Sequence, residues 1–534
     1  MSAVKRYCTM VRNETSLPKW LGGSSDDGTL DNNYADSTDG SETKEAPAAD
    51  VQIAEEKPKA QYWAIVATGA GLFSDGYVNS TVGFVTTMLK RIYGAKALSK
   101  SSAMSNISAI AFAGTVVGQL GFGFLADHHS RKIGMIISTG ILIVFSILLA
   151  GSYGIGMPTN PQGMLAAMTV YRAFLGIGIG GEYPAGSVAC AEVSQKLSKG
   201  SRNRYFVWFT NSMIDFGFVM SAFIAWLLLY ICSVPSSPDS DHGLSVAWRV
   251  LYGLGAIPPL SLLYLRLKFQ DDEQFTKNSL KHIRTPYWTI FKYYGPRMIL
   301  VSLIWFIYDF CTYSFGIFSP QIIGIVVKDN NIHTTFGWNT LFYVFYLPGT
   351  LLGAFASDYF GPRLTLFTGA VLQGIVGFIM TSQYATLIEH AAPFIVVFGV
   401  FTALGEFGPG NNIGLIASKS SASAIRGRYY GICAAVGKIG AFVGGYAFPA
   451  IADHYGGLDS FQGQTTLFYV SSALCIFSGL LVLLLPPLGQ TAVADEDRKF
   501  REYLESQGID TSMMGHEIKD TEYTTTHIEN VKEY

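Results

Sequence analysis

The sequence predicts an all-α membrane protein whose twelve transmembrane helices form two pseudo-symmetric six-helix bundles. Three observations indicate this class. Hydrophobic residues make up 49% of the 534 residues and charged residues only 14%, whereas soluble domains carry about 25% charged residues. Apolar segments long enough to cross a bilayer as helices recur along the chain. The sequence has no cluster of basic residues of the kind that binds nucleic acid. The expected environment of the chain is the lipid bilayer.

Twelve segments have the length and apolar character of a membrane-spanning helix. They lie at residues 62–89, 103–126, 133–153, 163–190, 204–232, 247–265, 298–327, 338–357, 364–383, 391–416, 428–451 and 465–485. The first six predict a bundle over residues 61–265, and the last six predict a second bundle over residues 298–487. Residues 266–297 form a polar central loop that is rich in lysine and arginine.

Polar tails precede and follow the two bundles. Residues 1–60 are acidic and hold no apolar core of a signal peptide, so we expect a disordered tail and a first helix that acts as the targeting signal. Residues 488–534 form the second tail, with a short amphipathic helix predicted at 500–504. Basic residues concentrate in the loops on one side of the predicted membrane, which indicates that this side, with both tails, is cytosolic. The first loop on the opposite side departs from this rule with Lys90, Arg91, Lys96 and Lys100.

A short loop motif recurs in the two halves. After the second segment a glycine is followed by Asp127 and Arg131. After the eighth segment another glycine is followed by Asp358 and Arg363. Such loops lock neighbouring helix ends by charge pairing and by interaction with helix dipoles. The motif resembles the loop signature of the major facilitator superfamily, although His128-His129-Ser130 departs from it. We expect a cytosolic gate made of six charged residues: Asp127, Arg131, Glu192, Asp358, Arg363 and Arg426.

Asp309 lies in the middle of the apolar run from about Met298 to Val327. A carboxylate at that depth costs roughly 2.5–3.5 kcal/mol to insert into a membrane. Trp305, Asp309 and Tyr313 are spaced four residues apart, so on a helix they share one face. That face offers an indole N–H, a carboxyl and a phenol. The combination predicts a proton carrier flanked by two hydrogen-bond donors.

Further polar side chains interrupt other predicted spans. They are Asp75 in the first span, Glu182 and Tyr183 in the fourth, Asn211 and Asp215 in the fifth, Glu406, Asn411 and Asn412 in the tenth, and Lys438 in the eleventh. Ionisable groups inside a membrane usually mark ligand or proton pathways. A structural role is favoured for Asp215. For Arg172, a structural role and attraction of the substrate are equally favoured. The six cysteines include no C-x-x-C pair, and no metal site or cofactor is expected.

Three of these patterns resemble the phosphate:proton symporter branch of the major facilitator superfamily. They are the Trp305-Asp309-Tyr313 spacing, the glycine-rich run that ends in Glu182-Tyr183-Pro184, and Gly-Lys-Ile-Gly-Ala around Lys438. Within this branch, Ser-Asp-Gly-Tyr-Val-Asn at 74–79 and Phe-Gly-Pro-Gly at 407–410 are similar to fungal glycerophosphodiester permeases. The resemblance extends from about Gln61 to Leu485. It implies proton-coupled uptake of glycerophosphoinositol or glycerophosphocholine across the plasma membrane by alternating access, by a chain that works as a monomer.

Inorganic phosphate is the alternative substrate, and a non-transporting nutrient receptor is the alternative of another class. Phosphate carriers have an asparagine where this chain has Gly410, and the missing side chain is expected to make room for a larger headgroup. An enzyme is not expected, because the sequence holds no nucleophile elbow, metal motif or phosphate loop.

The resemblance also implies roles for single residues. Proton coupling is expected from Asp75, Glu182 and Asp309. Substrate binding is expected from Arg172, Tyr183, Asn211, Trp305, Asp309, Tyr313, Asn411, Asn412 and Lys438. Lys438 would pair with the phosphodiester anion, and aromatic faces would hold a quaternary ammonium if the headgroup were choline.

Overall fold

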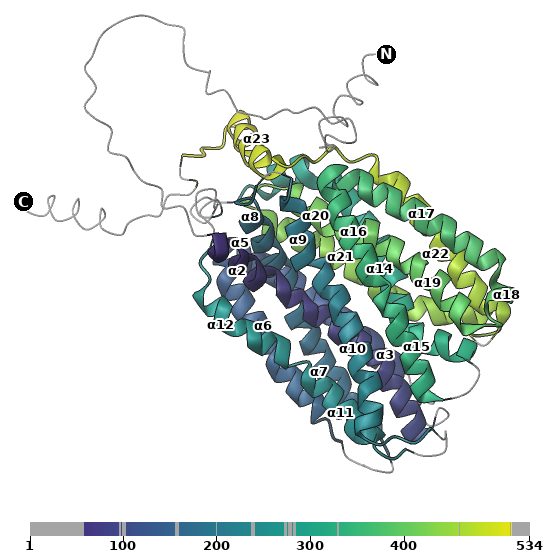
Figure 1. Cartoon of the computed structure of the whole chain (residues 1–534). Helices are drawn as coiled ribbons and strands as arrows, with labels where there is room; N and C mark the ends of the chain where they lie inside the picture. The colour runs from purple at the N-terminus through teal and green to yellow at the C-terminus, as the bar shows by residue number, and fades with distance from the viewer. Residues whose placement is uncertain are drawn as a thin grey trace, which may run out of the picture.

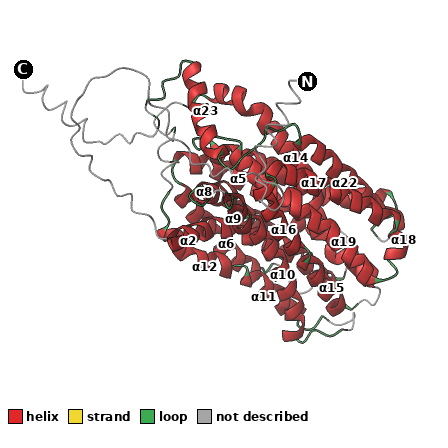
Figure 2. Cartoon of the chain, turned by 45° about the horizontal axis from the view of Figure 1, so that its top comes forward, coloured by secondary structure: helices red, strands yellow, loops and turns green. Residues whose placement is uncertain are grey.

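The computed structural model describes residues 58–94, 98, 103–154, 160–198, 200–236, 241–271, 275, 280, 285–327, 331–458, 460–512 and 514. Within these residues every regular element is a helix (Figure 2). Almost all of the predicted N-terminal tail, the end of the C-terminal tail, and Lys96 and Lys100 lie outside the described residues.

The helices of the first half run side by side with those of the second half (Figure 1). The first half contains α2 (Pro58–Gly69), η2 (Ala70–Leu72), α3 (Phe73–Tyr93), α5 (Ala103–His128), α6 (Arg131–Ala150), α7 (Gln162–Gly181), η3 (Glu182–Ser187), α8 (Val188–Ser194), α9 (Arg202–Phe209), α10 (Asn211–Ile231), α11 (Leu244–Leu254) and α12 (Ile257–Lys268). The second half contains α14 (Tyr287–Val327), α15 (Ile332–Val344), α16 (Tyr346–Tyr359), α17 (Pro362–Ser382), α18 (Tyr384–Leu387), α19 (Ala391–Gly405), η4 (Glu406–Gly410), α20 (Asn411–Lys419), α21 (Arg426–His454) and α22 (Phe461–Val482).

Eleven helical segments of the described chain are long and apolar enough to cross a membrane, and each matches one of the predicted spans. The predicted first span, which corresponds to α2, η2 and α3, is not among these eleven. Its α3 carries buried polar side chains, including Asp75 and Asn79, that lower its hydropathy. Because these side chains are buried within the protein, the segment completes the first six-helix half. The predicted fold class is confirmed.

The boundaries of the central loop differ from the prediction. Helix α12 continues to Lys268 and α14 already begins at Tyr287, so both ends of the predicted loop 266–297 are helical. Arg266 is fully buried. The predicted amphipathic helix in the second tail is also longer, because α23 spans Ala492–Ser506. We call the end of the bundle on which α23 packs the α23 face (Figure 1).

Equivalent helices of the two halves are interrupted by the same kind of turn. A π-helical turn follows α7 at Glu182–Ser187, and another follows α19 at Glu406–Gly410. Each turn contains a proline, Pro184 or Pro409, which has no backbone N–H to donate into the helix. Turns of this kind occur frequently at functional sites. Here they direct acidic side chains toward the interior, where Glu182 and Glu406 are buried.

Glycines let the helices that cross the middle of the molecule approach closely. On α21, a Cβ at Gly440 would lie 2.2 Å from the carbonyl oxygen of Phe306 on α14. A Cβ at Gly431 would lie 2.5 Å from the carbonyl oxygen of Gln119 on α5. Helix α21 therefore packs against both α14 of its own half and α5 of the other half, and carries Lys438 into the centre.

Candidate functional site

A buried ion cluster joins three helices near the centre of the molecule. The ammonium nitrogen of Lys438 on α21 lies 3.4 Å from Asp75 Oδ2 on α3 and 3.4 Å from Asp309 Oδ2 on α14. All three side chains are at most 2% exposed. Asp75 belongs to the first half and the other two residues to the second half. One ammonium is thus shared by two carboxylates across the boundary between the halves.

Two phenols complete this cluster. Tyr313 donates a hydrogen bond of 2.9 Å to Asp75 Oδ2, and Tyr183 donates to the same oxygen. The Lys438 ammonium lies 3.5 Å from the centre of the Tyr313 ring, a distance at which the ring face attracts a cation. Trp305 lies against Tyr183, with ring centres 6.2 Å apart. The structure therefore brings together the tryptophan, the carboxyl and the phenol that share one face of α14.

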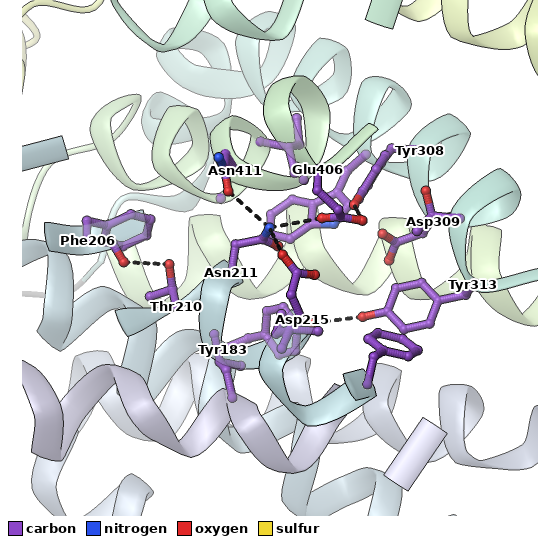
Figure 3. A pocket seen from close by; sticks show the side chains of 18 of the residues that line it. Tyr183, Phe206, Thr210, Asn211, Asp215, Tyr308, Asp309, Tyr313, Glu406 and Asn411 are labelled. Carbon is purple, nitrogen blue, oxygen red and sulfur yellow. Dashed lines mark hydrogen bonds between the residues drawn. The ribbon is translucent and has the colours of Figure 1, made fainter. Parts of the chain in front are cut away.

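A second polar group lies beside this cluster and contains two more carboxyls. The Asn211 side-chain nitrogen on α10 lies 3.3 Å from Asp215 Oδ2, 3.0 Å from Glu406 Oε2 and 3.1 Å from Asn411 Oδ1 (Figure 3). Tyr308 on α14 donates to Glu406 Oε1 at 2.9 Å. Asp215 and Glu406 are 1% and 2% exposed. This group also spans both halves, because Asn211 and Asp215 come from the first and the other residues from the second.

Both polar groups border one cavity. It is lined by Leu72, Tyr183, Phe206, Thr210, Asn211, Ile214, Asp215, Phe218, Trp305, Tyr308, Asp309, Thr312, Tyr313, Glu406, Gly410, Asn411, Ile413, Gly414 and Tyr430 (Figure 3). The space open to the centre of a water molecule is about 40 Å³. A single water needs roughly 10–15 Å³ of such space, so the cavity as it stands holds a few waters. A larger ligand requires the helices around it to separate.

Two atoms of the ion cluster keep hydrogen-bonding capacity. Asp309 Oδ2 and the Lys438 nitrogen are buried and make no hydrogen bond within the described structure, although each lies 3.4 Å from an opposite charge. Buried polar atoms in proteins are nearly always hydrogen-bonded. The arrangement is therefore suited to a polar ligand, with an ammonium for an anion and a carboxyl that becomes a donor when protonated.

Five residues expected at the site lie outside the cavity lining: Asp75 and Lys438 of the ion cluster, and Glu182, Arg172 and Asn412. Glu182 pairs with Arg266 at 2.6 Å through both carboxylate oxygens and accepts from Ser138 at 2.6 Å. Arg172 donates to the carbonyl oxygens of neighbouring helices, Ile107 at 2.6 Å and Val78 at 3.4 Å. These contacts hold helices of the first half together, and they place Glu182 and Arg172 away from the cavity.

Asn412 also lies outside the lining. Its oxygen accepts from Ser357 at 2.6 Å, and its nitrogen donates to the Gly408 carbonyl at 2.8 Å. Asn411, by contrast, reaches the cavity. The room expected at Gly410 is also filled, because a Cβ there would lie 2.1 Å from Glu406 Oε2 and 2.6 Å from the Tyr308 hydroxyl.

Charged residues predicted for the gate gather at the α23 face. Arg131 bridges Asp127 at 2.7 Å and Glu192 at 3.1 Å, all within the first half. Arg426 from the second half reaches the same Glu192 at 3.2 Å. Asp127 also accepts hydrogen bonds of 2.8 Å from the backbone N–H groups of Gly427 and Arg428, at the N-terminus of α21. The halves are thus tied by ion pairs and by a helix-terminal carboxylate.

The second loop motif makes the equivalent connection in the opposite sense. Asp358 accepts from the backbone N–H groups of Asn203 at 3.1 Å and Arg204 at 3.3 Å, at the start of α9 in the first half. The Arg204 side chain lies 3.6 Å from the same carboxylate. Arg363 donates to the Leu485 carbonyl at 2.9 Å, within the second half. Asp127 and Asp358 therefore each hold the other half's helix end.

The halves also meet at the face opposite α23. The rings of Phe84 and Phe336 lie 4.8 Å apart, and His333 hydrogen-bonds the Val234 carbonyl at 2.8 Å. The cavity thus has contacts between the halves on both of its sides.

Sequence reasoning assigned no site role to Glu406, Tyr308 or Tyr430, although all three line the cavity. Glu406 carried a signal, because it is an acid inside an apolar span. Tyr308 directly precedes Asp309, yet the pattern spaced by four residues selects only the neighbouring face.

Comparison with known proteins agrees with this architecture. The profile of the family described as "Sugar (and other) transporter" matches residues 63–284 and 267–488. The chain belongs to this family. It is 50% identical over 466 residues to the glycerophosphocholine permease GIT4 of Candida albicans, a match that covers 86% of this chain and 85% of the relative. It is 49% identical over 459 residues to the major glycerophosphoinositol permease GIT3 of the same organism, covering 85% and 84%.

A solved structure shares the fold. The proton:xylose symporter XylE, of the major facilitator superfamily, superposes with a TM-score of 0.68 at 16% sequence identity, covering 83% of this chain and all of that chain. The family and the relatives confirm the resemblance to fungal glycerophosphodiester permeases, and identify this chain as a multi-pass membrane transporter rather than an enzyme.

Proposed function

We propose that this transporter takes up glycerophosphodiesters together with protons across the plasma membrane, by alternating access, with both termini in the cytosol. The observation that carries the proposal is the Lys438 ammonium held between Asp75 and Asp309 beside a central cavity. Relatives at 49–50% identity are named as permeases for glycerophosphocholine and glycerophosphoinositol. We also propose that the chain acts as a monomer, because both six-helix halves that enclose the cavity belong to the same polypeptide.

The charge balance of the site supports proton coupling. Four buried carboxyls, of Asp75, Asp215, Asp309 and Glu406, lie in or beside the cavity. In the described part of the chain, Lys438 is the basic side chain within ion-pair distance of any of them. Adding an anionic phosphodiester to this excess of negative charge is unfavourable in a low dielectric. Protons on Asp75 and Asp309 remove that repulsion at the place where the phosphodiester binds Lys438.

Asp309 is the group best arranged to couple the proton to the substrate. While both carboxylates are ionised, the Lys438 ammonium is shared between them at equal distances of 3.4 Å. Protonation of Asp309 removes one of these attractions and leaves the ammonium available to a phosphate oxygen. The same protonation makes Asp309 a hydrogen-bond donor to the substrate. Asp75 remains as the second proton-coupling group, with Tyr183 and Tyr313 as donors.

The driving force follows from the charges moved. A monoanionic substrate enters against an inside-negative potential of ~2.3 kcal/mol per charge per 100 mV. One proton makes the step electroneutral, so that it runs on the pH gradient at ~1.4 kcal/mol per unit. Two protons would use the potential as well.

Alternating access is supported by the two sets of contacts between the halves. With only about 40 Å³ open to a water centre, the cavity has to enlarge before a glycerophosphodiester enters. Separation at the face opposite α23 would admit substrate, and separation of the gate around Asp127, Glu192 and Arg426 would release it. The cavity lies at the boundary between the halves, as in transporters that rock around a central site.

Uptake into vesicles tests the proposal. The purified chain is reconstituted, an inward pH gradient is imposed, and labelled glycerophosphoinositol, glycerophosphocholine and inorganic phosphate are offered separately. We expect accumulation of a glycerophosphodiester that stops when a protonophore collapses the gradient. Accumulation of phosphate alone would replace the substrate assignment. Binding without movement of any of the three would indicate a receptor and refute the transport function.

A further inference from the structure

We propose that Glu406 and Asp215 form a subsite for a cationic headgroup, such as the trimethylammonium of glycerophosphocholine, next to the Lys438 subsite for the phosphodiester. This inference rests on the proposed function and specifies which part of the cavity distinguishes a charged headgroup from a neutral polyol.

The hydrogen bonds around Asn211 indicate that this group is incomplete. Its amide nitrogen carries two hydrogens, yet three oxygens lie within 3.3 Å of it, from Asp215, Glu406 and Asn411. Tyr308 supplies one further donor, to Glu406, and the Thr350 hydroxyl supplies another, to Asn411. Asp215 shares the Asn211 amide and also interacts with the Thr350 hydroxyl and with Glu406, none of which carries a positive charge. Two carboxylates therefore face one another with too few positive groups to balance their charge.

The equivalent acid of the first half shows what a balanced site looks like. Glu182 and Glu406 both begin a π-helical turn directly after a glycine. Glu182 is neutralised by Arg266, from the last helix of its half, with two contacts of 2.6 Å. The corresponding helix of the second half, α22, contains no lysine or arginine. In the described chain Glu406 has no ion-pair partner, so the place that a cation fills in the first half faces the cavity in the second.

The surroundings of Glu406 suit a quaternary ammonium. Tyr308, Trp305, Phe206 and Phe218 line the same cavity, and aromatic faces attract such cations. The trimethylammonium group carries no N–H, so it needs negative charge and apolar surface rather than hydrogen-bond acceptors in fixed directions. Two carboxyls beside four aromatic rings provide both.

The two subsites lie side by side because their residues are neighbours on α14. Tyr308 bonds Glu406 at 2.9 Å, whereas the adjacent Asp309 lies 3.4 Å from Lys438. A cavity that is acidic at one end and holds an ammonium at the other is complementary to a zwitterion whose phosphate and ammonium are joined by two carbons. The Lys438 nitrogen and Asp309 Oδ2 make no hydrogen bond in the described structure, which independently indicates a ligand at the phosphate end.

The test compares two substrates in one variant. Glu406→Gln keeps the shape and the hydrogen-bonding capacity of the side chain and removes its charge. We expect the KM for glycerophosphocholine to rise at least tenfold, with the KM for glycerophosphoinositol changed less than threefold. Asp215→Asn should act in the same direction. Glu389→Gln, the same change at an exposed glutamate outside the cavity, serves as the matched control and should leave both KM values unchanged.

The outcomes separate the inference from the proposed function. Equal losses for both substrates in Glu406→Gln would overturn the subsite, because they would assign Glu406 to a step common to all substrates. Wild-type protein that accumulates glycerophosphoinositol but not glycerophosphocholine would overturn the subsite and leave the transport function intact. Wild-type protein that accumulates neither would refute the function itself.

Discussion

Replacing Asp309 by asparagine should separate substrate movement from proton movement. The variant removes the carboxyl that lies 3.4 Å from Lys438 and keeps a side chain of almost the same shape. Lys438 retains Asp75 at 3.4 Å and the Tyr313 ring at 3.5 Å, so the buried ammonium stays compensated and the protein should fold. Its effect should therefore fall on coupling and leave the amount of protein in the membrane unchanged.

The expected size of the effect follows from the proton that is lost. One coupled proton contributes ~1.4 kcal/mol per pH unit, or tenfold in accumulation ratio. With a gradient of two pH units, wild-type vesicles should concentrate substrate by about 100-fold more than vesicles of an uncoupled variant. In Asp309→Asn the ratio should stay near one, while exchange of labelled for unlabelled substrate at equal pH continues.

Asp453→Asn is the matched control for this experiment. Asp453 is an exposed aspartate near the far end of α21, and its replacement should leave accumulation at the wild-type level. Accumulation by Asp309→Asn equal to wild type would refute the assignment of Asp309 to proton coupling. It would also show that the closeness of Asp309 to Lys438 serves packing alone.

Two further predictions concern residues away from the cavity. Asp127→Asn removes the charge of the acceptor that binds the N–H groups of Gly427 and Arg428 at 2.8 Å. The loss should cost ~1 kcal/mol of local stability, so amide hydrogen exchange at the start of α21 should become about fivefold faster or more. An unchanged exchange rate there would contradict the gate. Glu182→Gln leaves Arg266 buried without its carboxylate, at a cost of roughly 3–5 kcal/mol, so the melting temperature should fall while the accumulation ratio of the folded protein stays at wild type. Loss of substrate accumulation by folded Glu182→Gln would contradict this expectation and assign Glu182 to proton coupling.

The fold could be predicted from sequence because apolar length is a local property. Eleven predicted spans recur as helices that can cross a membrane. The first span was also found, although its α3 carries buried polar residues such as Asp75. The Trp305-Asp309-Tyr313 face could be predicted for the same reason, since one helical period relates its members.

Contacts between distant segments could not be predicted in this way. Glu182 forms an ion pair with Arg266, which lies 84 residues later in the chain. No periodicity in the sequence predicts that pair. The sequence therefore offered Glu182 as a proton carrier, because an acid inside an apolar span looks the same with or without a partner. The expectation of free space at Gly410 has a related weakness. The carboxylate of Glu406, which lies in the same π-helical turn, fills the space that the missing side chain would leave.

The contacts of Asp75 suggest how binding and rocking are connected. Beside the cavity, Asp75 of the first half holds the second half through Lys438 at 3.4 Å and Tyr313 at 2.9 Å. A phosphate that takes the Lys438 ammonium weakens one of these ties. A ligand shifts a conformational equilibrium only by its difference in affinity for the two states. The substrate gains such a difference here, because the ammonium that it binds is also the ammonium that ties the two halves together.

The same reasoning explains why the proton and the substrate have to move together. If the substrate bound while Asp75 and Asp309 were both ionised, it would compete with two carboxylates for one ammonium. If the carboxyls were protonated without substrate, the buried ammonium would lose its compensating charge. Each half-loaded state therefore changes the net charge of the cluster of Asp75, Asp309 and Lys438, whereas one proton that binds together with the substrate leaves the net charge of the empty cluster unchanged. The empty state and this jointly loaded state are therefore suited to pass through the closed form in which both faces of the cavity are sealed.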